Sequence, residues 1–427
     1  MVLGNSMIIP VLPDIKYALN LTQFEVSMVI TLFSVPAGII IPLAGFLSDR
    51  FGRRIVIIPG LILYAAGGIV AGLAALLLTK YAYQAMLGGR ILQGIGAAGT
   101  APIAMALTGD LFPGKARSKA LGIIEAANGA GKVVSPILGA AIGMIIWFAP
   151  FLFFPAIIVP IVLGVWLVVK EPETNRSKQK VKDYIKSIGK VFEKKSAMLL
   201  SSFFAGMISL LVLFGVLFFL SDYLETTYGL DGVIKGLALA IPVLLMTVTS
   251  FATGALIKKK VKLMKWLVVT GLAIMGGSLA VLGLFRNTYL FFAAISLAGV
   301  GAGLVLPCLN TIITSAVSSQ RRGLLTSLYG SVRFFGVAAG PPAFGLLMEV
   351  DTRLMFWSAA GIALIAALLA LFLIRVKDMV KPGEPAPKEQ PPKSPDPDKE
   401  PRGGLTTNPV FVFAPARKPE PPQKDNS

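Results

Sequence analysis

Long apolar runs recur along most of this chain, and short charged segments separate them. Two neighbouring runs, 26–44 and 55–79, flank a turn that carries three arginines. An apolar helix of about 20 residues is long enough to cross the hydrocarbon core of a bilayer. Hydrophobic residues make up 55% of the chain, which is more than an ordinary soluble domain contains. The sequence therefore predicts an all-α integral membrane protein that uses the lipid bilayer as its solvent.

The apolar runs predict twelve membrane-spanning helices, of which the first is short. Residues 1–13 would form a helix only about 18 Å long, against a hydrocarbon core of about 30 Å. We therefore expect the first helix to be truncated at the N-terminus, with an in-frame start upstream. The other spans are predicted at 25–47, 55–79, 82–110, 119–145, 147–169, 197–221, 233–257, 263–285, 288–316, 323–347 and 353–374.

Basic residues alternate between the two sides of the predicted bundle. Segments assigned to one side hold 22 lysines and arginines, and segments assigned to the other side hold five. Lysine and arginine are enriched in cytoplasmic loops, so this asymmetry predicts a multi-pass protein of the cell membrane with both termini in the cytoplasm. Topology also accounts for the net charge of +18, and no nucleic-acid partner is needed to explain it.

An internal repeat divides the spans into two halves. The pattern Gly94-x-Gly96-Ala97 through Pro102 returns 205 residues later at Gly299, and the pattern around Ser135-Pro136 returns at Gly340-Pro341. Such a repeat is typical of transporters whose path lies between two halves. The predicted organisation is an N-terminal six-helix half (1–169), a cytoplasmic linker with an amphipathic helix (170–195), a C-terminal six-helix half (196–376) and a disordered proline-rich cytoplasmic tail (377–427).

The turn after the second span carries the most specific motif. It reads Gly45-Phe-Leu-Ser-Asp49-Arg50-Phe-Gly52-Arg53-Arg54. Glycine permits a close helix contact at position 45 and a tight turn at position 52. Asp49 is expected to cap the following helix or to bind a neighbouring arginine. The spacing resembles the signature loop of the major facilitator superfamily. That resemblance implies a gating role, with Asp49 stabilising the outward-facing state at the cytoplasmic side.

The fifth span combines small residues with a proline. Gly122, Gly131, Ser135, Pro136 and Gly139 resemble the antiporter motif of the twelve-span drug:proton antiporter families, in which glycine stands where this chain has Ser135. Small residues let helices approach closely, and a proline bends a span. The resemblance implies an exporter whose kinked helix prevents leak. The alternative is ordinary small-residue packing.

Three charged residues are predicted inside the spans of the N-terminal half. Arg90 begins a pattern that resembles a second superfamily signature, whose arginine is proposed to aid proton coupling. An alternative structural role is open to Arg90, because antiparallel register would let it bind the carbonyls freed by Pro136. Glu125 and Lys132 share one face of the fifth span but are too far apart for a tight pair. We predict that Glu125 carries a coupled proton, tuned by Lys132 and Arg90; a structural ion-pair latch is the alternative.

The remaining polar and aromatic residues in the spans predict a substrate cavity rather than a reaction centre. The chain has no histidine and one cysteine, so it offers no metal-ligand cluster, and we expect no cofactor and no enzyme activity. The expected function is proton-driven export of a small amphipathic molecule by a monomer. The alternatives are export of an endogenous metabolite such as a siderophore or lipid precursor, which the buried cations would suit if the cargo is anionic, and a membrane sensor or intramembrane enzyme. The predicted cavity residues are Asn5, Gln93, Asn128, Phe214, Phe218, Asn310 and Arg333.

Overall fold

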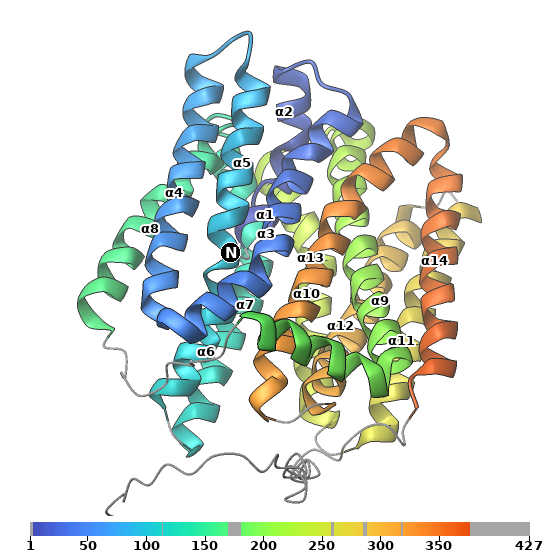
Figure 1. Cartoon of the computed structure of the whole chain (residues 1–427). Coiled ribbons are helices and arrows are strands. Elements are labelled where there is room, and N and C mark those ends of the chain that lie inside the picture. The colour runs from blue at the N-terminus through green and yellow to red at the C-terminus, as the bar shows by residue number, and fades with distance from the viewer. Residues whose placement is uncertain are drawn as a thin grey trace, which may run out of the picture. The chain divides into compact units, whose positions relative to one another are not determined.

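The described residues fold entirely into helices (Figure 1). The computed structural model describes residues 3–112, 114–169, 181–257, 260–284, 288–316 and 319–375. The elements are α1 (Leu3–Ser6), η1 (Ile9–Val11), α2 (Leu12–Ala18), α3 (Gln23–Phe51), α4 (Arg53–Leu77), α5 (Ala82–Ala98), α6 (Ala101–Leu111), α7 (Gly114–Gly143), α8 (Ala149–Val168), α9 (Val181–Tyr228), α10 (Gly232–Ile257), α11 (Val261–Leu284), α12 (Thr288–Ser315), α13 (Ser319–Val350) and α14 (Thr352–Leu373).

The twelve-helix prediction is confirmed. In the described part of the chain, 10 segments are long and apolar enough to cross a membrane, with α5 and α6 together forming one of them. The 30-residue helix α7 corresponds to the predicted fifth span, and the segment from α1 to α2 corresponds to the first. The predicted tail, 377–427, lies outside the described residues, as does the start of the linker.

Two details differ from the sequence prediction. The fourth span breaks into α5 and α6 around Gly99 and Thr100, because Pro102 has no N–H to donate to the carbonyl of Ala98. The helix predicted in the linker is present from Val181 and is continuous with the seventh span, so that both belong to α9. Its position on the cytoplasmic surface stays a prediction, because the side chains before Ser196 are not described.

Equivalent helices pack alike in the two halves. In the first half, a side chain at Gly94 of α5 would overlap the carbonyl oxygen of Phe33 in α3. In the second half, a side chain at Gly299 of α12 would overlap the carbonyl oxygen of Pro242 in α10. The repeated glycines therefore have equivalent roles. Gly94 allows the fourth span to pack closely against the second, and Gly299 allows the tenth span to pack closely against the eighth.

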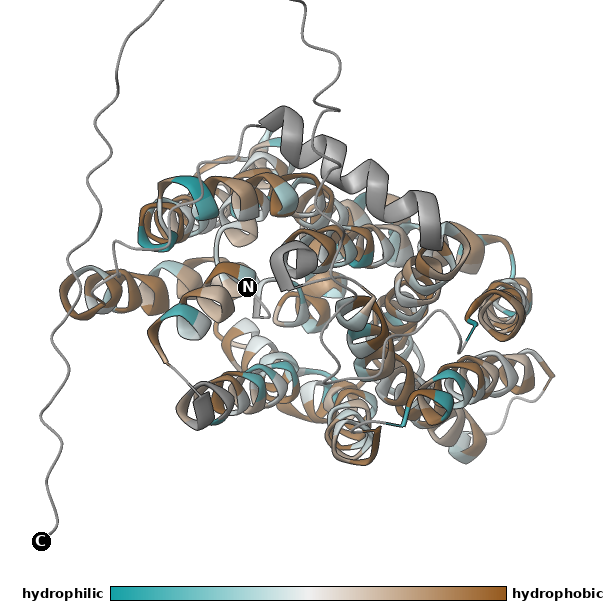
Figure 2. Ribbon diagram, turned by 60° about the horizontal axis from the view of Figure 1, so that its bottom comes forward, coloured by the Kyte–Doolittle hydropathy of each residue, from teal (hydrophilic) through white to brown (hydrophobic). Residues whose placement is uncertain are grey.

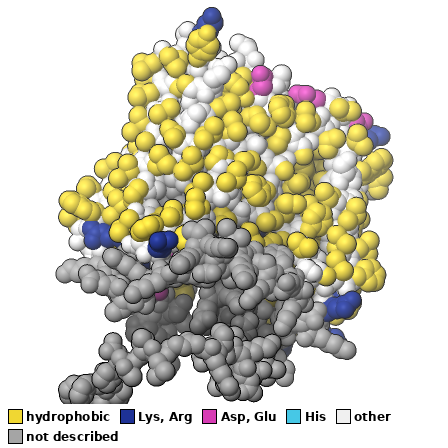
Figure 3. Space-filling model, in the orientation of Figure 1, with side chains coloured by type: hydrophobic (Ala, Val, Ile, Leu, Met, Phe, Trp, Pro, Cys, Tyr) yellow, Lys and Arg dark blue, Asp and Glu magenta, His cyan; other side chains and the backbone are white. Residues whose placement is uncertain are grey.

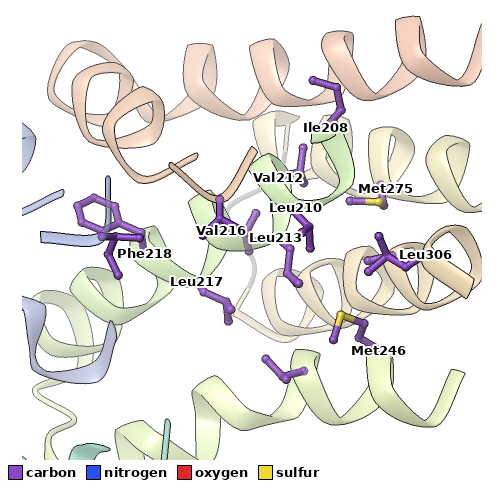
Figure 4. Close-up of a cluster of buried hydrophobic side chains, with 14 of the residues drawn as sticks. Ile208, Leu210, Val212, Leu213, Val216, Leu217, Phe218, Met246, Met275 and Leu306 are labelled. Carbon is purple, nitrogen blue, oxygen red and sulfur yellow. The ribbon is translucent and has the colours of Figure 1, made fainter. Parts of the chain in front are cut away.

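Hydrophobic side chains fill the interior and also cover the outside of the bundle. In the second half the core surrounds α9, and most residues in the most apolar part of its span are buried. Its aliphatic side chains meet Met246 of α10, Met275 of α11 and Leu306 of α12 (Figure 4). Brown hydrophobic stretches run along the outer helices in Figure 2, and Figure 3 shows hydrophobic side chains over most of the visible face that is not grey. Such an outer surface suits contact with lipid acyl chains.

Candidate functional site

The two halves meet along two pairs of helices, α3 with α13 and α7 with α10. Thr31 of α3 donates a hydrogen bond from Oγ1 to the carbonyl oxygen of Ala338 in α13, at 2.8 Å. Closer to the Asp49 turn, Gly45 lies so near Ser327 of α13 that an added Cβ would stand 3.0 Å from its Oγ. Gly45 therefore permits the close helix contact that was predicted, and this contact joins the halves.

The Asp49 turn is held together inside the first half. Asp49 pairs with Arg53 four residues later, and the Nε of Arg53 lies 3.2 Å from Oδ2 of Asp110 at the end of α6. The predicted bond between Asp49 and a neighbouring arginine is thus present. The predicted helix cap is absent, because Gly52 holds the N-cap position of α4 with φ 120° and no side-chain bond. Among the described residues, Asp49 forms no ion pair with a residue of the second half.

Arg90 is completely buried at the centre of the first half. Its Nε donates to the carbonyl oxygen of Val29 at 2.8 Å, and its two terminal nitrogens donate to Gln93 Oε1 at 2.7 Å and Asn5 Oδ1 at 2.6 Å. The guanidinium also lies 4.5 Å from the ring centroid of Phe33. Arg90 therefore ties α5 to α3 and to the first span through neutral acceptors.

This bonding pattern corrects one expectation about Arg90. The predicted acceptors were carbonyls of the fifth span freed by Pro136, but its acceptors lie in α1, α3 and α5. The physical reason is that α1 and α3 pack beside α5 and place their oxygens within hydrogen-bond distance of the guanidinium. Asn5 also donates from Nδ2 to Ser34 Oγ at 2.7 Å. Asn5 and Gln93, predicted to line a cavity, are thus committed to Arg90.

Glu125 and Lys132 lie on an open face of α7. The Glu125 side chain is exposed and the Lys132 side chain is half-buried. A Cβ added at Gly122 or Gly131 would meet nothing within 4 Å, whereas one added at Gly129 would come within 2.8 Å of Thr247 Cγ2 in α10, so this stretch of α7 is only partly packed. No ion pair joins Glu125 to Lys132 in the described part of the chain, as their spacing predicted. Glu125 lies within a span but is not enclosed by protein.

Arg333 of α13 approaches the same face from the second half. Its charge and that of Glu125 both act on the Lys132 ammonium. The Nε of Arg333 is buried without a hydrogen-bond partner among the described residues, and so are Asn128 Oδ1 and Ser135 Oγ of α7. A buried polar atom without a partner is costly, so such atoms call for a ligand or water. Lys132 and Arg333 thus bring one cation from each half into the same region. Arg333 Nε, Asn128 Oδ1 and Ser135 Oγ are the unsatisfied polar atoms of these residues.

The second part of the predicted antiporter motif is tightly packed. A side chain at Gly139 would overlap the carbonyl oxygen of Met7 in the first span. On the other side of α7, a Cβ at Gly236 of α10 would come within 2.8 Å of the carbonyl oxygen of Pro136. From Pro136 onward α7 is therefore packed between the first and eighth spans, whereas positions 122 and 131 have no atom of another residue close to them.

The other predicted cavity residues fall in three environments. Phe218 is 2% exposed and belongs to the hydrophobic core, Phe214 is half-buried, and Asn310 is exposed. A separate cavity of about 460 Å³ lies where α13 turns into α14. Its lining includes Phe219, Tyr223, Phe291, Asp351, Arg353 and Phe356, and none of the predicted cavity residues.

Sequence analysis missed a charged cluster centred on Lys235, which it had counted only among the five basic residues on the second side of the membrane. Lys235 of α10 is 1% exposed, and its Nζ lies 2.6 Å from Glu225 Oε2, 3.2 Å from Asp231 Oδ1 and 3.9 Å from Asp14 Oδ2. We call these four residues the distal cluster, because they lie at the end of the bundle opposite the Asp49 turn. The available signal was the gathering of acidic residues near the ends of the first, seventh and eighth spans.

More polar contacts join the halves beside the distal cluster. Gln23 at the start of α3 donates from Nε2 to Asp222 Oδ1 at 2.7 Å and from its backbone N–H to Glu349 Oε1 at 3.2 Å. Lys16 pairs with Asp222 at 3.7 Å. Ser221 donates from Oγ to the carbonyl oxygen of Ile9 at 2.9 Å. The halves are therefore held together at the distal end by hydrogen bonds and ion pairs.

Comparison with known proteins relates this architecture to one family. The sequence pattern described as the Major Facilitator Superfamily matches residues 1–282 and 264–416. The bacillibactin exporter of Bacillus subtilis is 44% identical over 379 residues, which cover 88% of this chain and 94% of that protein. Multidrug resistance protein 1 of Bacillus subtilis is 26% identical, with 86% of this chain and 92% of that protein covered.

Solved structures agree on the fold. The crystal structure of a bacterial homolog of the human lysosomal transporter Spinster, in an inward-facing and occupied conformation, superposes with a TM-score of 0.71 over 89% of this chain and 96% of that chain. Its sequence identity of 18% supports a shared fold only.

Proposed function

Because this chain belongs to the Major Facilitator Superfamily, we propose that it exports an endogenous siderophore in exchange for protons by alternating access. The family relation makes the chain a membrane transporter of small molecules. Our initial expectation of a multidrug exporter is less well supported than its alternative, siderophore export, because of the 44% identity to a bacillibactin exporter. The proposal places the Asp49 turn in the cytoplasm, in line with the distribution of basic residues.

The observation that supports this cargo is the pair of cations between the halves. Lys132 of α7 and Arg333 of α13 stand beside buried polar atoms that have no partner among the described residues, and Glu125 is exposed on the same open face of α7. An anionic or zwitterionic cargo would supply the missing charge and hydrogen bonds. A simple cation would be repelled by both residues, which is why we favour a siderophore over a cationic drug.

We further propose that Glu125 carries the coupled proton. A carboxylate facing lipid at this depth would be costly, so the open face of α7 is expected to line the path between the halves. A charged Glu125 would attract Lys132, and a protonated Glu125 would not. Proton and cargo can then bias the same equilibrium between inward-facing and outward-facing states. Arg90 is expected to support this region by fixing the first, second and fourth spans.

The test is export of bacillibactin by inverted vesicles with an imposed proton gradient. Lys132→Ala and Arg333→Ala should each reduce bacillibactin accumulation about tenfold, the effect of losing roughly 1.4 kcal/mol of charge-assisted binding. Lys80→Ala is the matched control, because Lys80 is exposed between α4 and α5. Unchanged bacillibactin export by both variants, or faster export of a cationic dye than of bacillibactin by the wild type, would refute the anionic-cargo proposal.

A further inference from the structure

The distal cluster joins the two halves through one ammonium group and three carboxylates. Glu225 and Asp231 belong to the same half as Lys235 and lie 2.6 Å and 3.2 Å from its Nζ. Asp14 belongs to the other half and lies 3.9 Å away, at the limit of an ion pair. Lys235 is therefore already neutralised by its own half before Asp14 arrives.

This arrangement makes Asp14 the poorly compensated member of the cluster. One carboxylate oxygen from each of Asp14, Glu225 and Asp231 lies within 4.8 Å of the other two. Carboxylates this close repel one another, and a single ammonium offsets only one of the three charges. When the halves separate, Asp14 leaves with the first half and becomes hydrated. When they close, a charged Asp14 must lose water and approach two like charges.

We propose that the distal cluster is a proton-sensitive gate, in which protonation of Asp14 allows the two halves to close over Lys235. A neutral Asp14 approaches the cluster without repulsion, and its O–H can donate a hydrogen bond to a neighbouring carboxylate. Proton uptake from the distal side therefore favours the closed distal end. The role of this gate in transport rests on the proposed proton-driven cycle, whereas the gate itself does not.

The pKa of Asp14 supports the direction of this effect. Asp14 follows the predicted first span, 1–13, and burial raises its pKa from 3.8 to about 6, with Lys235 opposing the shift and Glu225 and Asp231 adding to it. An open, hydrated Asp14 returns toward the ordinary value. A group that binds protons more tightly in the closed state stabilises that state as pH falls. From pH 7 to pH 5 the closed-to-open ratio should rise about tenfold.

The charged and titratable groups around Asp14 do not reverse this sign. From α2, Lys16 is engaged by Asp222 at 3.7 Å, and Tyr17 stays neutral in this pH range because burial and the charge of Asp222 raise its pKa. From α9 and α13, Asp222 and Glu349 are both bound by Gln23. The surroundings of Asp14 are therefore acidic on every side except for Lys235 and Lys16.

The experiment measures the gate without any cargo. In a Cys308→Ala background, spin labels on Ala18 and Thr227, which are exposed on opposite halves, report the distal distance in nanodiscs from pH 5 to pH 8. Acidification from pH 7 to pH 5 should increase the ratio of the short-distance to the long-distance population of the wild type about tenfold. Asp14→Asn should hold the short distance at every pH. Asp351→Asn is the control, because Asp351 caps α14 outside the cluster and should leave the pH response unchanged.

A second variant separates a proton gate from a structural contact. Glu225→Gln removes a like charge, so it should move the midpoint of the distance change to lower pH rather than abolish it. The gate would be refuted if acid increased the distance between the labels in the wild type. It would also be refuted if Asp14→Asn showed the same pH response as the wild type. The proposed function can fail independently, because bacillibactin export does not enter this measurement. A working gate with no bacillibactin export would refute only the cargo.

Discussion

Arg90→Lys tests whether Arg90 stabilises the protein through its three hydrogen bonds, which we call the structural tie, or through its positive charge alone. The guanidinium bonds Val29, Gln93 and Asn5 from three different nitrogens. A lysine ammonium keeps the charge but has a single nitrogen, so it cannot reach acceptors on three sides at the same distances. We expect the substituted lysine to keep one of the three hydrogen bonds.

The cost follows from the two bonds that are lost. Side-chain hydrogen bonds between membrane helices contribute about 0.6–1.7 kcal/mol each. Two of them give a loss of about 1–3 kcal/mol in the free energy of unfolding. The π contact with Phe33 weakens as well, since arginine is the more frequent partner of an aromatic ring. The destabilisation should therefore lie toward the upper end of that range.

The assay is unfolding of the purified protein in detergent, followed by tryptophan fluorescence against denaturant. Arg353→Lys is the matched control, because Arg353 is exposed at the start of α14 and should leave stability unchanged. Adding Asn5→Ala should cost less in the Arg90→Lys protein than in the wild type, because the Asn5 bond is already weakened. Wild-type stability of Arg90→Lys, or full additivity with Asn5→Ala, would refute the structural tie.

Three further variants test the rest of the site. Gly139→Ala should destabilise the protein by about 1–3 kcal/mol, because the new methyl group overlaps the Met7 carbonyl. The same denaturant assay measures this loss, and an unfolding midpoint equal to that of the wild type would contradict the tight packing. Asp49→Asn should insert normally but lose transport in vesicles, because its charge-assisted bond to Arg53 weakens, and wild-type rates would remove Asp49 from the mechanism. Glu125→Gln should keep cargo counterflow but lose accumulation driven by a proton gradient; full accumulation would move the coupled proton elsewhere.

Much of the fold was predictable from the sequence because the bilayer imposes a simple length rule. Apolar runs of about 20 residues had to become helices, and their ends agree with the structure to within a few residues at α4, α10 and α12. The repeated glycines were also informative, since Gly94 and Gly299 proved to make equivalent backbone contacts.

The site was harder to predict because hydrogen bonding depends on which helices meet. The sequence placed Asn5 and Gln93 in a cavity and Arg90 against α7, whereas Arg90 donates a hydrogen bond to each of the other two. Helical spacing fixes which residues share one face of a helix, but it does not say which neighbour that face will meet. Phe218 shows the same limit, since its side chain went into the core.

By itself, the sequence determined that this chain spans a membrane, that it is built from two similar halves, and that its Asp49 turn follows a family motif. Those properties depend on local composition, on spacing along one helix, and on repetition. Only the tertiary structure decided that Lys235 is buried among Asp14, Glu225 and Asp231. These residues come from three separate segments, and a charge can be buried at low cost only where folding brings opposite charges or hydrogen-bond partners around it.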